Sequence, residues 1–174
     1  MMRKTLLIKL FVMVGFVLTL TIAAKAQMAQ FQALYIYNFA KNIAWPAEDS
    51  QKDLVVTVIG DNDLISELNK LAQTKKIANR KLVVKESAVV NGLAKSDIIY
   101  LGESKSAQIA TLVANQKGNR TLIVSGKQGH CASGAGVSFV MNGAKLGFEI
   151  SSNNISSGGL QVSQKLLNLG TEVN

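Results

Sequence analysis

Residues 54–60 read LVVTVIG, an apolar run that contains no proline and closes on a glycine. An uninterrupted run of this length, rich in Val and Ile, is typical of a strand buried on both faces of a parallel sheet. Asp61 then offers a helix cap, and Leu64 and Leu68 follow at helical spacing. The stretch therefore predicts a strand followed by a helix, the repeating unit of an α/β domain.

The same unit repeats further along the chain. Three later runs are rich in Val, Ile or Leu and close on a glycine or a charged residue: residues 81–86 (KLVVKE), 97–102 (DIIYLG) and 121–126 (TLIVSG). Ile109, Leu112 and Val113 mark a helix before the last run, whereas residues 89–94 have room only for a short helical turn. Because crossovers between parallel strands are right-handed, few strand orders remain. We expect a three-layer, flavodoxin-like (Rossmann-like) α/β fold with a mainly parallel sheet and flanking helices.

The segment beyond residue 126 has a different pattern. A glycine-rich loop, GHCASGAG at residues 129–136, leads into two strands within residues 137–150. Asn142-Gly143 between these strands is a strong signal for a two-residue hairpin turn. The pattern predicts a C-terminal antiparallel β-hairpin, then a polar break at residues 153–159 and a last helix at residues 160–169.

Residues 28–44, MAQFQALYIYNFAKNIA, are predicted to form a helix that ends at Trp45-Pro46, because proline disfavours helical geometry at the residue before it. Apolar residues occupy two sides of the helical wheel: Phe31, Leu34, Tyr35 and Phe39 on one, and Ile36, Ala40 and Ile43 on the other. Tyr37 and Lys41 lie on the remaining polar arc. A helix with so wide an apolar surface is expected to be covered on most sides.

The first 26 residues predict an export leader. A basic start is followed by a nearly continuous apolar run at residues 10–22, and Ala24-Lys25-Ala26 places small residues before a cut at Gln27. The apolar run is shorter than the roughly 20 residues that a membrane-spanning helix needs. We expect cleavage after Ala26 and export of the mature chain, with a retained N-terminal anchor as the alternative.

The remaining residues, 27–174, fit a single domain. A chain of this length buries about two-thirds of its unfolded surface, so its core needs no metal or disulfide. Leader removal leaves 15 of the 19 basic residues and all 11 acidic ones, a net charge of +4 instead of +8. These basic residues form no dense stripe interleaved with aromatic residues, which argues against a nucleic-acid partner.

A catalytic apparatus is hard to assemble from this sequence. His130 is the only histidine and Cys131 the only cysteine, so a His-based metal site and an intramolecular disulfide are excluded. Adjacent side chains point in opposite directions on extended backbone, unlike a nucleophile and its base. The glycine-rich loop lacks the Lys-Ser/Thr ending of a phosphate-binding loop. The sequence names no catalytic residue, metal ligand or cofactor, and an exported hydrolase using His130 and Cys131 is the weakest alternative.

Polar and small residues follow the carboxyl ends of the predicted strands, where open α/β sheets place their ligands. Asp61, Gly102 and Gly126 are the candidate ligand-binding residues at this edge. Asp61 has a second interpretation, since an aspartate in that position caps the following helix.

Four blocks of the sequence resemble one family. The aromatic helix ending in Trp-Pro, ALYIYNFAKNIAWP at residues 33–46, resembles the opening signature of the YfiR-like periplasmic proteins. Three further blocks are similar to the family's first strand, terminal hairpin and closing segment: LVVTVIGD at residues 54–61, KLGFEI at 145–150 after Phe139, and GLQVSQKLLNL at 159–169. The blocks keep their order and span essentially the whole mature chain.

The resemblance implies a non-enzymatic periplasmic regulator. Relatives bind the periplasmic sensor domain of an inner-membrane diguanylate cyclase and hold it inactive, which lowers cyclic-di-GMP and biofilm formation. Other relatives are sensor modules that are fused to histidine kinases or encoded beside them. The partner here is expected to be a separate chain, and the protein would reach the membrane only through it. Well-known relatives contain cysteine pairs, so a redox mechanism does not carry over to a chain whose single thiol is Cys131.

Large aromatic residues are frequent anchors of protein interfaces, so we place the partner contact at Trp45 and Pro46, with Tyr37 and Lys41 beside them. Trp45 has the alternative role of a core plug at the end of the helix. A small-ligand sensor that represses no enzyme directly is the alternative function. The direction of regulation and a possible homodimer stay open.

Overall fold

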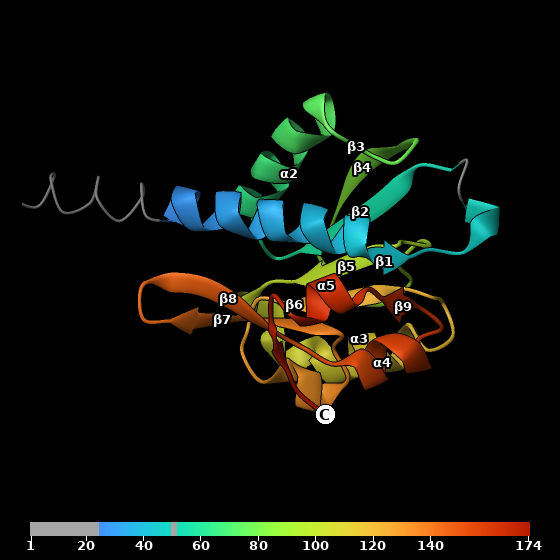
Figure 1. Ribbon diagram of the computed structural model, residues 1–174. Coiled ribbons are helices and arrows are strands. Elements are labelled where there is room, and N and C mark those ends of the chain that lie inside the picture. The colour runs from blue at the N-terminus through green and yellow to red at the C-terminus, as the bar shows by residue number, and fades with distance from the viewer. Residues whose placement is uncertain (1–24, 50–51) are drawn as a thin grey trace, which may run out of the picture.

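The computed structural model describes residues 25–49 and 52–174 (Figure 1). After an N-terminal helix over residues 25–42, the strands are β1 (Ile43–Ala44), β2 (Leu54–Ile59), β3 (Lys76–Ile77), β4 (Arg80–Ser87), β5 (Ile98–Leu101), β6 (Leu122–Ser125), β7 (Val137–Asn142), β8 (Lys145–Ile150), β9 (Gln161–Val162) and β10 (Thr171–Glu172). The further helices are α2 (Asn62–Thr74), α3 (Ile109–Asn115), α4 (Ser152–Ser157) and α5 (Gln164–Leu167), with 3-10 turns η1 (Ala47–Asp49), η2 (Glu103–Gln108) and η3 (His130–Ser133).

The main sheet confirms the predicted flavodoxin-like order. Its strands run β10-β8-β7-β6-β5-β2-β4-β3, and the five central strands from β4 to β7 are parallel to their neighbours. Across the sheet from β4 to β7, these five are the second, first, third, fourth and fifth in the chain, which is the flavodoxin arrangement. β8 returns antiparallel to β7, so the C-terminal hairpin is also confirmed.

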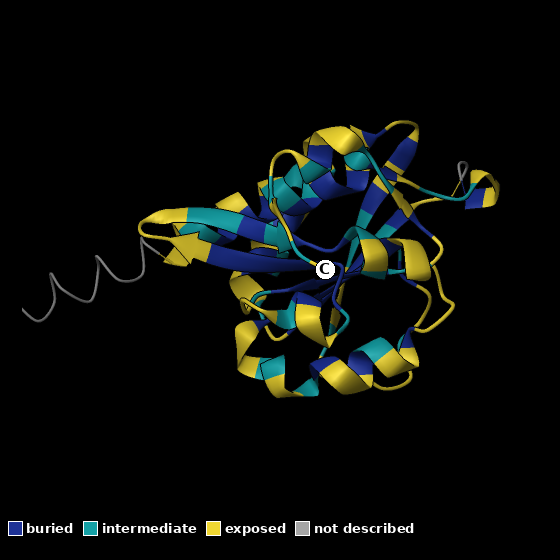
Figure 2. Ribbon diagram, turned by 60° about the horizontal axis from the view of Figure 1, so that its bottom comes forward, coloured by how far each residue is buried: buried dark blue, intermediate teal, exposed yellow. Residues whose placement is uncertain are grey.

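Helices cover both faces of this sheet. The N-terminal helix and α2 lie over one face and α3 over the other (Figure 1). Neighbouring residues of β2 face opposite sides of the sheet: Val58 packs with the N-terminal helix and α2, and Ile59 packs with α3. This alternation follows from the two-residue period of a strand. Buried residues accordingly run through the strands, while the outer faces of the helices are exposed (Figure 2).

One side of the N-terminal helix differs from the expectation. Phe39 is fully buried, but Phe31 is 45% exposed and Leu34 is 41% exposed. The helix rests on a single sheet face, and the small residues Ala29 and Ala33 face the core and allow close approach. The prediction that the helix is covered on most sides is therefore wrong for the Phe31 side.

Four local predictions are also wrong. Residues 89–94 form bends and no helical turn, and Gly143-Ala144 form the centre of the hairpin turn. α4 occupies most of the predicted polar break, because Ser151 caps it by accepting from the N–H of Asn154 at 3.2 Å. The predicted last helix is reduced to α5, because β9 before it pairs with β1. That pairing joins residues far apart in the chain, which local patterns do not reveal.

The predicted leader lies outside the described residues except for its last two, Lys25 and Ala26. These residues and Gln27 are exposed in the first described turn of the N-terminal helix. Over residues 25–49 and 52–174, no helix combines the length and the apolarity that crossing a membrane requires.

Candidate functional site

Two of the predicted partner residues lie at the end of the N-terminal helix, and one of them, Tyr37, connects this end to β3. Tyr37 donates its phenolic O–H to the carbonyl of Lys76 at 3.2 Å. Lys41, one turn further on, holds its ammonium 5.6 Å from the centroid of the Tyr37 ring, a cation–π contact. The structure thus brings Tyr37 and Lys41 together beside the β3–β4 hairpin.

Trp45 closes the same helix end. Its indole N–H donates to the carbonyl of Ala40 at 2.8 Å, which satisfies one of the carbonyls that a helix end leaves free. The ring packs against the main core and lies 6.0 Å from the guanidinium of Arg80. The carbonyl of Pro46 accepts from the N–H of Asp49 at 3.0 Å. Because Trp45 and Pro46 remain partly exposed, they serve the fold and also border the surface.

A buried ion pair lies beside Trp45. The Arg80 side chain is 5% exposed and donates to Asp97 Oδ1 at 2.8 Å. Its Nε and Nη2 also donate to the carbonyls of Lys52 and Asp53, at 2.9 Å and 3.0 Å. Asp97 Oδ2 accepts from the N–H of Val55 at 2.8 Å. The pair therefore joins the start of β4 to the residue before β5, and its further hydrogen bonds reach the start of β2 between them.

A crevice of about 300 Å³ lies at the carboxyl ends of β2, β5 and β6. Asp61 and Gly126 line it, as predicted, and its other polar lining residues are Lys25, Gln32, Asp63, Tyr100 and Glu103. Gly102 does not line it: a Cβ there would come 2.7 Å from the carbonyl oxygen of Gly60. Gly102 is therefore required by the close approach of two strand ends. Among the described residues, no three His, Cys, Asp or Glu side chains are placed to hold a metal ion.

Tyr100 connects two polar side chains of this crevice by hydrogen bonds, a role that was not predicted from the sequence. Its hydroxyl accepts from Gln32 Nε2 at 3.3 Å and donates to Asp61 Oδ2 at 3.4 Å. Burial, and then the charge of Asp61, raises the pKa of Tyr100 far above its usual value, so the phenol keeps its proton. Asp61 Oδ1 caps α2 by accepting from the N–H of Leu64 at 2.9 Å, which confirms the capping interpretation, while ligand binding by Asp61 stays a prediction. The available signal was a single phenol within an apolar strand.

The glycine-rich loop does not couple its histidine to its cysteine. Ser125 Oγ lies 2.8 Å from His130 Nδ1, whereas Cys131 Sγ accepts from Ser138 Oγ at 3.4 Å. Burial raises the pKa of the Cys131 thiol, and burial together with the charge of Lys127 lowers the pKa of His130. Within the part of the chain that the structure describes, no hydrogen bond joins His130 to Cys131. The thiol is buried and protonated, without the adjacent base that nucleophilic catalysis requires.

This burial predicts slow thiol chemistry. We expect Cys131 in the native protein to react with iodoacetamide on the order of a hundredfold more slowly than in urea, because the reactive species is an exposed thiolate. Mass spectrometry of samples quenched over time measures both rates. Equal rates with and without urea would contradict the buried position, and Ser138→Ala tests whether its hydroxyl contributes to the protection.

An apolar groove of about 480 Å³ lies between the N-terminal helix and the β7–β8 hairpin. Its lining consists of Gln27, Met28, Phe31, Tyr35, Ala144, Lys145 and Leu146. The hairpin extends beyond the body of the domain (Figures 1 and 2), and Met141 near its tip is 47% exposed. This surface was not predicted from the sequence, because Phe31 was expected on a covered side of the helix.

Comparison with known proteins identifies a family for this chain. A family model described as YfiR/HmsC-like matches residues 29–171. A search of the curated proteins finds no match. The matched range includes the candidate partner residues around Trp45 and the polar network around Tyr100.

Proposed function

The chain belongs to the YfiR/HmsC-like family, and from this premise we propose that it is a periplasmic protein that binds and represses an inner-membrane diguanylate cyclase. Members of this family are periplasmic repressors of membrane diguanylate cyclases. The observation that carries the proposal is the extent of the match, residues 29–171, which reaches every strand of the main sheet. Repression of this kind lowers cyclic-di-GMP and biofilm formation by reversible binding alone.

The proposed contact is the helix-end face, which comprises Tyr37, Lys41, Trp45 and Pro46. Trp45 offers a partly exposed aromatic surface, the type of side chain that most often anchors an interface. The bonds from Tyr37 to Lys76 and from Trp45 to Ala40 hold this face in one conformation. A preorganised surface loses little conformational entropy on binding.

Deletion of the gene in its own bacterium is expected to raise cyclic-di-GMP and biofilm mass. The full chain supplied from a plasmid should reverse both changes, because the leader directs it to the compartment of the cyclase sensor domain. The matched control is residues 27–174 made without the leader, which should not restore repression. If deletion leaves cyclic-di-GMP unchanged, or if the leaderless protein represses fully, the proposal is wrong.

The binding step of this experiment uses the purified mature protein as bait for detergent-solubilised membranes. Lys41→Glu should retain about tenfold less cyclase, since a charge at an interface rim mainly affects association. Lys117→Glu is the control, because Lys117 is also exposed and follows α3 on the other face of the sheet. Recovery of a histidine kinase in place of a cyclase would show that the partner is a different class of signalling enzyme. Equal losses of binding for both variants would exclude the helix-end face as the contact surface.

A small-ligand sensor is the second candidate function. The observation that favours it is the crevice around Tyr100, which lies beside the switch point of the strand order, between β2 and β5. A ligand bound there should raise the melting temperature in proportion to occupancy in a screen of nucleotides, amino acids and peptides. The same rise in Asp61→Ala and Gln32→Ala variants would place the ligand elsewhere.

A further inference from the structure

One edge of the main sheet is only partly covered. β3 pairs with Arg80 and Lys81 at the start of β4 and extends no further. On its other side β4 pairs with β2 continuously from Leu82 to Ser87. Among the described strands, none therefore lies along the outer side of residues 82–87. A free edge of this kind is a template for the addition of another strand.

The geometry of the β3–β4 hairpin identifies which backbone groups are free. Ile77 and Arg80 are opposite each other across a two-residue turn, so they form a hydrogen-bonded pair, and the direction of backbone groups then alternates along β4. The N–H and C=O groups of Val84 and Glu86 accordingly point away from β2. The carbonyl of Lys76 fits the same alternation, because it points away from β4 and accepts from Tyr37.

A groove of about 310 Å³ lies beside this edge, where α2 ends and β4 begins. Its lining consists of Ala72, Gln73, Thr74, Lys75, Lys76, Lys81, Leu82 and Val83. Leu82 and Val84 turn their side chains to the core on the α2 side of β4. The groove thus lies at the start of the free edge, and its apolar lining residues are Ala72, Leu82 and Val83.

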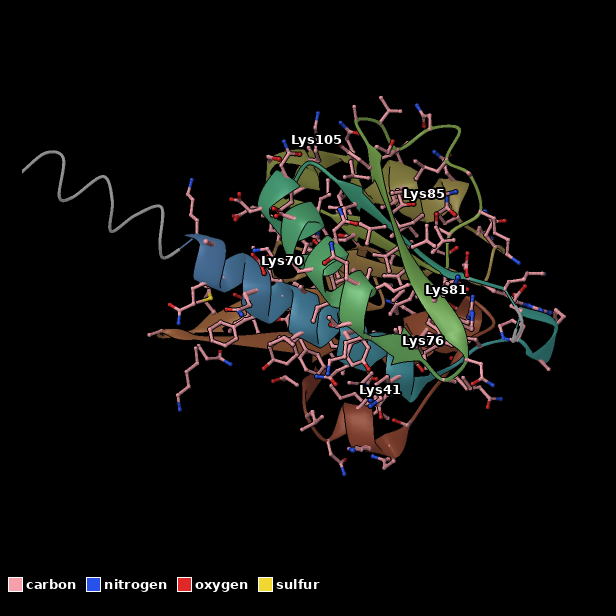
Figure 3. All side chains as sticks on the ribbon, turned by 90° about the horizontal axis from the view of Figure 1, so that it is seen from above. Lys41, Lys70, Lys76, Lys81, Lys85 and Lys105 are labelled. Carbon is pink, nitrogen blue, oxygen red and sulfur yellow. The ribbon has the colours of Figure 1, made fainter. Side chains whose placement is uncertain are left out.

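The charges along this edge are almost all positive. Four exposed lysines line it: Lys75, Lys76, Lys81 and Lys85. Figure 3 shows Lys76, Lys81 and Lys85 along the β3–β4 hairpin. In the described ranges none of the four forms an ion pair, and Glu86 is the single acidic residue between positions 75 and 87. Lys81 and Lys85 are four residues apart on one strand, so they lie on the same face of β4.

We propose that the free edge of β4 binds an extended acidic segment of a partner protein as an added strand. Backbone groups of that segment pair with Val84 and Glu86, and its alternate acidic side chains lie on the face of Lys81 and Lys85. Binding of this type takes its affinity from main-chain hydrogen bonds and its specificity from alternate side chains. The identity of the partner as a cyclase rests on the proposed function, whereas the strand addition does not.

Charge complementarity selects this occupant over the alternatives. Pairing with a second copy of β4, antiparallel and centred on Val84, would place Lys85 diagonally across from Lys81 and Lys85 of the copy, which is repulsive. An anionic lipid surface attracts the same lysines, but it presents no strand of N–H and C=O groups to pair with the edge. Edge lysines also protect against aggregation, and that protection does not hinder a segment of opposite charge.

The probe for this site is a short capped peptide of alternating Glu and Val, added to the isotope-labelled mature protein. We expect chemical-shift changes and slower hydrogen exchange at the amides of Val84 and Glu86. The amide of Lys85 faces β2 and should keep its exchange rate. A peptide with Lys in place of Glu should not bind. A peptide with N-methyl groups on all Val residues, or on all Glu residues, removes the N–H groups of one of its two edges, and one of these two forms should fail to bind.

Two kinds of variant test the site from the protein side. The Lys81→Glu/Lys85→Glu double variant should weaken peptide binding by about tenfold, whereas Lys117→Glu/Lys165→Glu changes the net charge equally at other exposed positions and should not. Val84→Pro removes an outward N–H, a change that edge strands tolerate, and should abolish binding. Circular dichroism and urea unfolding verify the fold, and the lysine variants keep the test decisive if Val84→Pro does not fold.

Several results would overturn this proposal. Binding of the Lys peptide as tight as that of the Glu peptide would show that charge does not select the occupant. Concentration-dependent dimers that Val84→Pro abolishes would assign the edge to a second copy. Binding to phosphatidylglycerol vesicles without binding of the Glu peptide would assign the lysines to a lipid surface. None of these results depends on the cyclase, so the proposed function would still be tested separately by the deletion experiment.

Discussion

Phe39→Ala is expected to lower the free energy of unfolding by about 3–5 kcal/mol, the usual cost of replacing a buried phenylalanine by alanine. Phe39 is 0% exposed, and its ring centroid lies 4.9 Å from that of Phe148 and 5.9 Å from that of Phe139. These two partners belong to the paired strands β7 and β8, which limits their movement into the space that alanine leaves. The unfilled volume therefore adds to the lost transfer free energy.

Urea unfolding followed by circular dichroism measures this change. The matched control is Phe31→Ala on the same helix, because Phe31 is 45% exposed and should lose less than about 1 kcal/mol. Equal losses for the two variants would mean that the N-terminal helix does not dock on the sheet through Phe39.

Asp97→Ala is expected to destabilise the protein by a similar amount, about 3–5 kcal/mol. The change leaves the guanidinium of Arg80 buried without its counter-charge, since both side chains are largely inaccessible, at 5% and 11% exposure. It also removes the acceptor of the Val55 N–H. An unpaired buried charge is costly because the protein interior solvates it far less well than water does.

Two comparisons isolate the buried charge as the cause. Lys70→Ala breaks the pair of Lys70 with Glu67, in which the lysine is 66% exposed, and should cost less than about 1 kcal/mol in the same urea measurement. The double variant Arg80→Met/Asp97→Ala removes both charges and should be more stable than Asp97→Ala alone. If the double variant is less stable than Asp97→Ala, the lower free energy of unfolding is caused by lost packing and not by the unpaired charge.

The positions of the main strands could be predicted from the sequence because they rest on local signals, and the right-handedness of crossovers then limited the order of the strands. β2, β5 and β6 are short apolar runs that end next to Gly or Ser, and each pattern lies within a few consecutive residues. Asp61 and Gly126 were placed in the crevice by the rule that ligands meet the carboxyl ends of parallel strands. The hairpin turn was misplaced by one residue, since Gly143 takes the left-handed φ of 62° at the first central position.

Other parts of the site required the fold. Tyr100 meets Gln32 and Asp61 from positions 68 and 39 residues away, and the Arg80–Asp97 pair joins two strands that have β2 between them in the sheet. The free edge of β4 depends on how short β3 is. No pattern within one segment encodes such contacts, because they form only when distant elements pack.

By itself, the sequence determined which residues prefer strands, helices and turns, how the strands are ordered, and which family the chain resembles. The element types depend on side-chain shape and on apolar spacing within single elements, whereas the strand order follows from the right-handedness of crossovers. Tertiary structure alone decided which side of the N-terminal helix is buried, which polar groups share the crevice and which strand edge stays open. Burial and pairing are properties of two surfaces in contact, and each surface is completed by residues from elsewhere in the chain.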